Sequence, residues 1–135
     1  MNAEVRGARQ VALGVAGLVA LDAVGGTVAV AADVNTPAEA WGSKALLAAP
    51  WPMIAAQVGL ATAACRWRDE RGVAAAGLLS GACLVSAASG FFDGGLGNPE
   101  VPDRLVPLQW VLTATTAVVG AVAAKYALRL RASRR

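Results

Sequence analysis

Residues 18–30, LVALDAVGGTVAV, place one carboxylate, Asp22, in the middle of an apolar run. The run extends over residues 11–32 and contains no other ionisable side chain, which is the length and composition of a helix that crosses a membrane. Asp22 is then expected near the middle of the bilayer, where a charge is costly and an acid is by default a functional candidate. The sequence therefore predicts an integral membrane protein with a candidate site inside its first helix.

Three further apolar blocks predict three more membrane spans. With the first, the expected spans are residues 11–32, 45–65, 73–92 and 105–128. Each is long enough to cross a hydrocarbon layer of about 30 Å as a helix, whereas barrel strands would be about half as long. Of the 135 residues, 56% are hydrophobic and only 16% are charged. We therefore expect one all-α domain over residues 1–135, a transmembrane four-helix bundle.

The basic side chains gather on one side of the expected membrane. Of the 12 Lys and Arg residues, only Lys44 and Arg104 lie in the first and third loops, and the others lie near the termini and in the second loop. This bias predicts that both termini are cytoplasmic in a plasma (inner) membrane. The cations thus indicate topology, and nucleic acid is not an expected partner. Because Asp22 interrupts the first span, we expect that span to be retained and not cleaved as a signal peptide.

The first outer loop contains a signal for the start of a helix. Thr36 and Glu39 have the spacing of a capping box, and a proline follows Thr36 at the favoured first position. We therefore expect a short interfacial helix over residues 37–49. Pro50 and Pro52 should separate it from the second span. Trp41 is expected in an aromatic belt at the membrane surface.

Polar side chains in the outer halves of the expected helices predict a shared pocket. Asp33 follows Asp22 by eleven residues, three turns plus about 20°, so both acids are expected on one helix face. The other helices contribute Gln57 from the second span, Ser86, Ser89 and Asp93 from one face of the third, and Gln109, Thr113 and Thr116 from one face of the fourth. We expect an outward-facing pocket with Asp22 at its floor.

Small residues repeat every four positions in each expected helix, as in closely packed membrane helices. The repeats are Ala12, Ala16 and Ala20; Ala55, Gly59 and Ala63; Gly77 and Gly81; and Gly120 and Ala124. Packing within the chain is the favoured interpretation, and a homo-oligomer is the alternative.

The two cysteines, Cys65 and Cys83, are expected at depths that differ by roughly 16 Å, which is too far for a disulfide. The chain contains no histidine and no pair of cysteines at ligand spacing. The sequence therefore implies no metal site and no cofactor.

Three functions are compatible with these patterns. The favoured one is binding or transformation of a small lipophilic molecule, with Asp22 as general acid and Asp33 or Asp93 as the opposing base, as in an isomerase, cyclase or hydrolase. A second is a proton- or cation-coupled transporter that acts as an oligomer, although the charge bias opposes an antiparallel dimer. A third is a non-catalytic membrane subunit that contacts membrane lipid or another protein. In that case Asp22 joins helices through Gln57 or a threonine.

Overall fold

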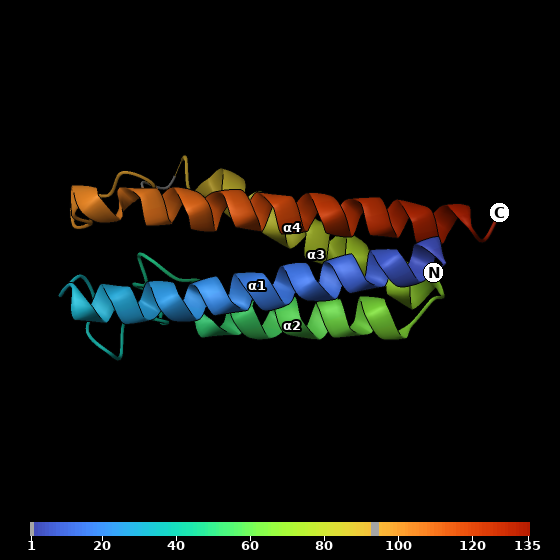
Figure 1. The fold of residues 1–135 in the computed structure, drawn as a ribbon, viewed down its shortest axis with the longest axis horizontal. Coiled ribbons are helices and arrows are strands. Elements are labelled where there is room, and N and C mark those ends of the chain that lie inside the picture. The colour runs from blue at the N-terminus through green and yellow to red at the C-terminus, as the bar shows by residue number, and fades with distance from the viewer. Residues whose placement is uncertain (1, 93–94) are drawn as a thin grey trace.

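The computed structural model describes residues 2–92 and 95–135. In these residues the chain forms four α-helices, one short 3-10 helix and no strand. The elements are α1 (Ala3–Ala31), α2 (Trp51–Arg66), α3 (Glu70–Ser89), η1 (Asp103–Leu105) and α4 (Val106–Ala132). They form an elongated bundle in which α1 and α3 each pack against both α2 and α4 (Figure 1). The expected all-helical fold is confirmed.

The two ends of the bundle differ in content. The termini end holds both chain termini and the short turn between α2 and α3, and the loop end holds residues 32–50, 90–92 and 95–102 (Figure 1). The basic residues near the termini and around residues 66–71 therefore share one end of the molecule. The charge asymmetry of the sequence is thus an asymmetry along the bundle axis.

Among the described helices, three are long and apolar enough to cross a membrane: α1, α3 and the continuous unit Asp103–Ala132. Helix α2 has 16 residues and begins at Trp51, six positions after the expected start of the second span. Pro50 precedes α2 and Pro52 lies in its first turn. Both prolines are tolerated there because the first amides of a helix have no partner within the helix. Helix α2 therefore begins at the prolines, but residues 37–49 before them form no helix from which they could separate it.

The interfacial helix expected over residues 37–49 is not formed, because this segment consists of turns and bends. Half of the predicted capping box is present at its start, where the backbone N–H of Thr36 donates to Glu39 Oε2 at 3.1 Å. The Thr36 hydroxyl donates to the same oxygen at 2.9 Å, whereas the Glu39 N–H donates to the Thr36 carbonyl and not to the hydroxyl. The chain then turns inward, and Ala40 and Leu47 are completely buried. Burial of these side chains at the loop end replaces the surface helix that the local pattern favours.

Apolar packing is divided into two clusters along the bundle axis. The larger cluster fills the half toward the termini end, with Leu18, Leu79 and Tyr126 among its most buried members. The smaller cluster lies at the loop end and centres on Leu47 and Val101. Asp22 lies in α1 between residues of the two clusters, so the polar site separates them.

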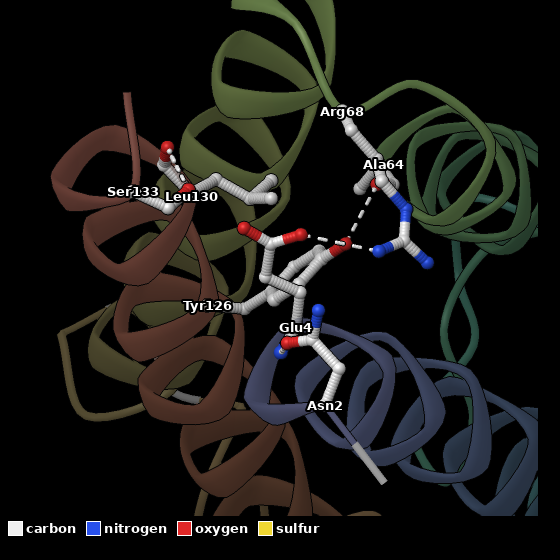
Figure 2. A network of polar contacts seen from close by, with 7 residues as sticks. All are labelled: Asn2, Glu4, Ala64, Arg68, Tyr126, Leu130 and Ser133. Atoms are coloured by element: carbon white, nitrogen blue, oxygen red, sulfur yellow. Dashed lines mark hydrogen bonds and ion pairs between the residues drawn. The ribbon is translucent and has the colours of Figure 1, made fainter. Parts of the chain in front are cut away.

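The termini end is closed by a polar network around Tyr126 (Figure 2). The Tyr126 hydroxyl donates to the carbonyl of Ala64 at 3.3 Å and so connects α4 to α2. Arg68 pairs with Glu4 at 3.1 Å, and the ring of Tyr126 lies against Gly7, where an added Cβ would come within 2.6 Å of the ring. These contacts join the ends of α1, α2 and α4.

Most of the small-residue repeats face outward, so the expectation that they pack within the chain is wrong for them. Ala12, Ala16 and Ala20 are exposed, and a Cβ added at Gly59, Gly77 or Gly81 would meet no atom within 4 Å. Gly120 does pack within the chain, because it is buried and lies against Leu84 and Cys83, and Ala63 is half-buried against the larger apolar cluster.

Candidate functional site

Asp22 joins α1 to the inward-folded segment 32–50. Its carboxylate Oδ1 accepts a hydrogen bond of 2.8 Å from the backbone N–H of Ala49, and its backbone carbonyl accepts one of 3.1 Å from Trp41 Nε1. The residue is only 3% exposed, and Oδ2 has no hydrogen-bond partner among the described residues. Oδ1 therefore binds the segment through the Ala49 N–H, whereas no described group donates to Oδ2.

Two glycines after Asp22 allow the segment to approach α1 closely. A Cβ at Gly25 would overlap the carbonyl oxygen of Leu47, and a Cβ at Gly26 would overlap the indole ring of Trp41. Trp41 therefore packs inside the loop end, which corrects its expected place in an aromatic belt. The segment covers the face of α1 between Asp22 and the loop end of the bundle.

A cavity of about 290 Å³ lies beside Asp22, between the four helices and the loop segments, with Met53 as the contribution of α2. The polar residues that line it are Asp22, Ser86, Ser89, Gln109, Thr113 and Thr116, all of which the sequence placed in one pocket. Its apolar wall includes Leu46, Leu47, Met53, Leu96 and Leu112. Helical periodicity was sufficient to find these positions on α3 and α4, because both helices remain regular through them.

Two other predicted site residues, Gln57 and Asp33, do not join this group. Gln57 is 3% exposed, but it does not line the cavity, and its Oε1 has no partner among the described residues. Asp33 is exposed and lines a separate surface pocket. Asp93 lies outside the described residues.

The position of Asp33 follows from the end of α1. The helix ends at Ala31, and Asp33 has a left-handed backbone with φ of 55°. The eleven-residue register that placed Asp33 above Asp22 therefore does not extend to it. Among the described residues, the cavity has one carboxyl group, that of Asp22.

The surface pocket that contains Asp33 is stabilised by Glu39. Hydrogen bonds from the backbone N–H and hydroxyl of Thr36 lower the pKa of the Glu39 carboxyl, and Lys44, 3.7 Å away, lowers it further to a smaller extent. Glu39 therefore stays ionised and holds the first turn of the segment in place.

Gln109 connects the two loop segments over the cavity. Its Nε2 donates to the carbonyl of Gly95 at 2.9 Å and to that of Leu46 at 3.3 Å. Asn35 acts in a similar way within residues 32–50, since its Nδ2 donates to the Lys44 carbonyl and its Oδ1 accepts from the Leu46 N–H. Sequence analysis did not identify Asn35, because an asparagine in a turn-rich loop has no distinguishing pattern.

Neither thiol chemistry nor metal binding has support from the geometry of the described residues. Cys65 and Cys83 are both free thiols. Within residues 2–92 and 95–135, no group of acidic, thiol or imidazole side chains is arranged to hold a metal ion. Comparison with protein-family models, curated proteins and solved structures found no match to the chain. The cavity beside Asp22 is therefore the basis for a functional proposal.

Proposed function

We propose that this protein is a membrane-embedded binding protein for a small lipophilic molecule, which occupies the cavity beside Asp22. The observation that carries the proposal is a buried carboxyl group with one unpartnered oxygen at a cavity with both hydroxyl-bearing and apolar walls. A volume of about 290 Å³ is at the lower end of the range for small-molecule sites. A fully structural carboxyl would be expected to have partners for both oxygens.

Binding is favoured over acid–base turnover. Proton transfer in both directions needs an acid and a base on opposite sides of the reacting group. Asp33 lies in a different pocket, the other expected base, Asp93, lies outside the described residues, and the described wall of the cavity offers no second carboxyl. We therefore propose a ligand site and assign no reaction to it.

We also propose that all four helices cross the membrane, with both termini in the cytoplasm. Helix α2 is about 24 Å long, less than the hydrocarbon thickness of about 30 Å. The buried stretch before it can complete the crossing, because non-helical backbone is tolerated at membrane depth where protein covers it or it lines a cavity. The concentration of cations at the termini end supports the orientation.

Labelling of intact cells with a membrane-impermeant maleimide tests this topology. Ser43→Cys is expected to react from outside, and Ser133→Cys only after the cells are permeabilised. Cys65 is half-buried and Cys83 is buried, so both should give a low background. The opposite pattern would overturn the orientation, and reaction of both sites from outside would overturn a four-span topology.

Ligand binding is tested with benzyl alcohol as the probe, on protein purified in a mild detergent. Calorimetry is expected to show saturable binding that Ala87→Met abolishes, because Ala87 lines the cavity and a longer side chain would fill it. Ala88→Met is the matched control, since Ala88 is the next residue of α3 and is exposed. Thr113→Met fills the cavity from α4 if the first variant is unstable. Equal heats from all variants would mean that the probe only enters the micelle, and the proposal would be wrong.

A further inference from the structure

The Asp22 carboxyl group has no cationic side chain beside it in the described cavity wall. None of the described lining residues is a lysine or an arginine. Lys44 is at the surface, where it pairs with Glu39 at 3.7 Å, and Arg104 is exposed in η1. A buried carboxylate without a cation is unfavourable, so a ligand that supplies positive charge would be stabilised there.

Three of the four hydroxyl groups in the described wall already donate their protons within the protein, and Thr113 is the fourth. Ser89 Oγ donates to the Ser86 carbonyl at 2.9 Å, and Thr116 Oγ1 donates to the Leu112 carbonyl at 2.8 Å. Ser86 Oγ donates to the sulfur of Met53 at 3.7 Å. These three oxygens therefore have their lone pairs left to offer to a ligand.

The buried side-chain amide of Gln109 is also left with a free acceptor rather than a free donor. Both hydrogen bonds of Gln109 Nε2 go to loop carbonyls, whereas its Oε1, like Asp22 Oδ2, has no partner among the described residues. Apart from Thr113, whose hydroxyl can donate or accept, the polar side chains of the described wall offer acceptors, so the main unmet need is for hydrogen-bond donors.

We infer that the ligand of this cavity is a small organic ammonium: a protonated amine on an apolar body. The ammonium supplies the positive charge and the donors that Asp22 and the hydroxyl oxygens lack. The leucine and methionine side chains of the wall cover the body, which favours an organic cation over an alkali-metal ion. Asp22 Oδ2 is covered by neighbouring atoms, so binding requires a small rotation of the carboxyl group toward the cavity.

This inference rests on the proposed binding function, and the test separates the two. Benzylammonium, benzyl alcohol and toluene have the same ring and differ in charge and in donors. We expect wild-type protein at neutral pH to bind benzylammonium about tenfold or more tightly than benzyl alcohol, because hydrogen bonds to charged groups are the stronger class. Toluene should bind most weakly.

The variant Asp22→Asn removes the charge but keeps an oxygen that can accept from the Ala49 N–H. It is expected to lose the preference for benzylammonium while still binding benzyl alcohol. Ser43→Asn, at an exposed loop position, is the control and should leave the preference unchanged.

Each outcome has one meaning. Saturable binding of benzyl alcohol without a preference for benzylammonium would overturn the ammonium inference and leave the binding proposal intact. A preference that persists in Asp22→Asn would also overturn it. Displacement of benzylammonium by equimolar sodium chloride would identify an inorganic-cation site instead. Absence of saturable binding by any probe would overturn the proposed function itself.

Discussion

The close approach of residues 32–50 to α1 makes Gly25 the most sensitive position of the loop end. In Gly25→Ala the new Cβ would overlap the Leu47 carbonyl oxygen and would lie 2.9 Å from its carbonyl carbon. Carbon atoms pack at about 3.5–4.0 Å, and the Leu47 oxygen is closer to the new Cβ than the carbon is, so the segment must move by more than about 1 Å to relieve both contacts. We therefore expect the segment to be partly detached.

The loss of stability in Gly25→Ala is measured against Gly17→Ala, a substitution in the same helix. Gly17 is exposed, and an added Cβ there would meet no atom within 4 Å. Both substitutions gain a similar helix propensity, so this contribution cancels when the two variants are compared. The difference that remains is the overpacking cost of about 1–3 kcal/mol. Gly25→Ala should be less stable than Gly17→Ala by that amount.

Two assays report the change. Thermal unfolding in detergent can be followed by maleimide labelling of Cys83, which is completely buried in the folded protein. Tryptic cleavage after Lys44 reports detachment of the segment itself, because Asn35 holds the Lys44 carbonyl in the folded chain. Faster cleavage is expected in Gly25→Ala than in Gly17→Ala. Equal midpoints and equal cleavage rates would show that residues 32–50 do not pack on α1.

Three other predictions follow from single contacts. Asp22→Ala removes the acceptor for the Ala49 N–H and should destabilise the protein by about 1.5–3 kcal/mol, whereas Asp22→Asn should cost clearly less. Equal losses of stability would show that the bond from Ala49 to Asp22 does not hold the segment. Tyr126→Phe should cost about 0.5–1.5 kcal/mol through the lost bond to Ala64, and an unchanged midpoint would show that this bond contributes nothing. The pKa of Glu39 is lowered in the folded state, so its carboxylate stabilises the fold. This stabilisation is present above the ordinary glutamate pKa of about 4.3 and is lost as the pH falls through the lowered value. Hydrogen exchange of the Thr36 amide, corrected for the intrinsic rate, should accelerate over that range in wild type but not in Glu39→Gln.

Helix content and the composition of the cavity wall were accessible from sequence for a local reason. The apolar blocks are long, and backbone groups inside such blocks are satisfied by bonds four residues apart. Helical periodicity then places Ser86 and Ser89 on one face of α3, and Gln109, Thr113 and Thr116 on one face of α4. No knowledge of distant contacts is needed for either inference.

The exposed small residues show the limit of the same approach. Gly77 and Gly120 both belong to four-residue repeats, yet only Gly120 is buried. Periodicity identifies a face of a helix, but it does not say which neighbour covers that face.

By itself, the sequence determined the all-helical class, the separation of charge between the two ends, and the polar faces of α3 and α4, because each depends on residues close together in the chain. Only the tertiary structure decided the path of residues 32–50, the partner of Asp22 and the separation of Asp33 from it. The contacts that set this path join Asp22 to residues 19 and 27 positions away. Such bonds form only after the bundle has brought α1 and the loop together, and they override the local tendency of the residues after Thr36 to continue as a helix.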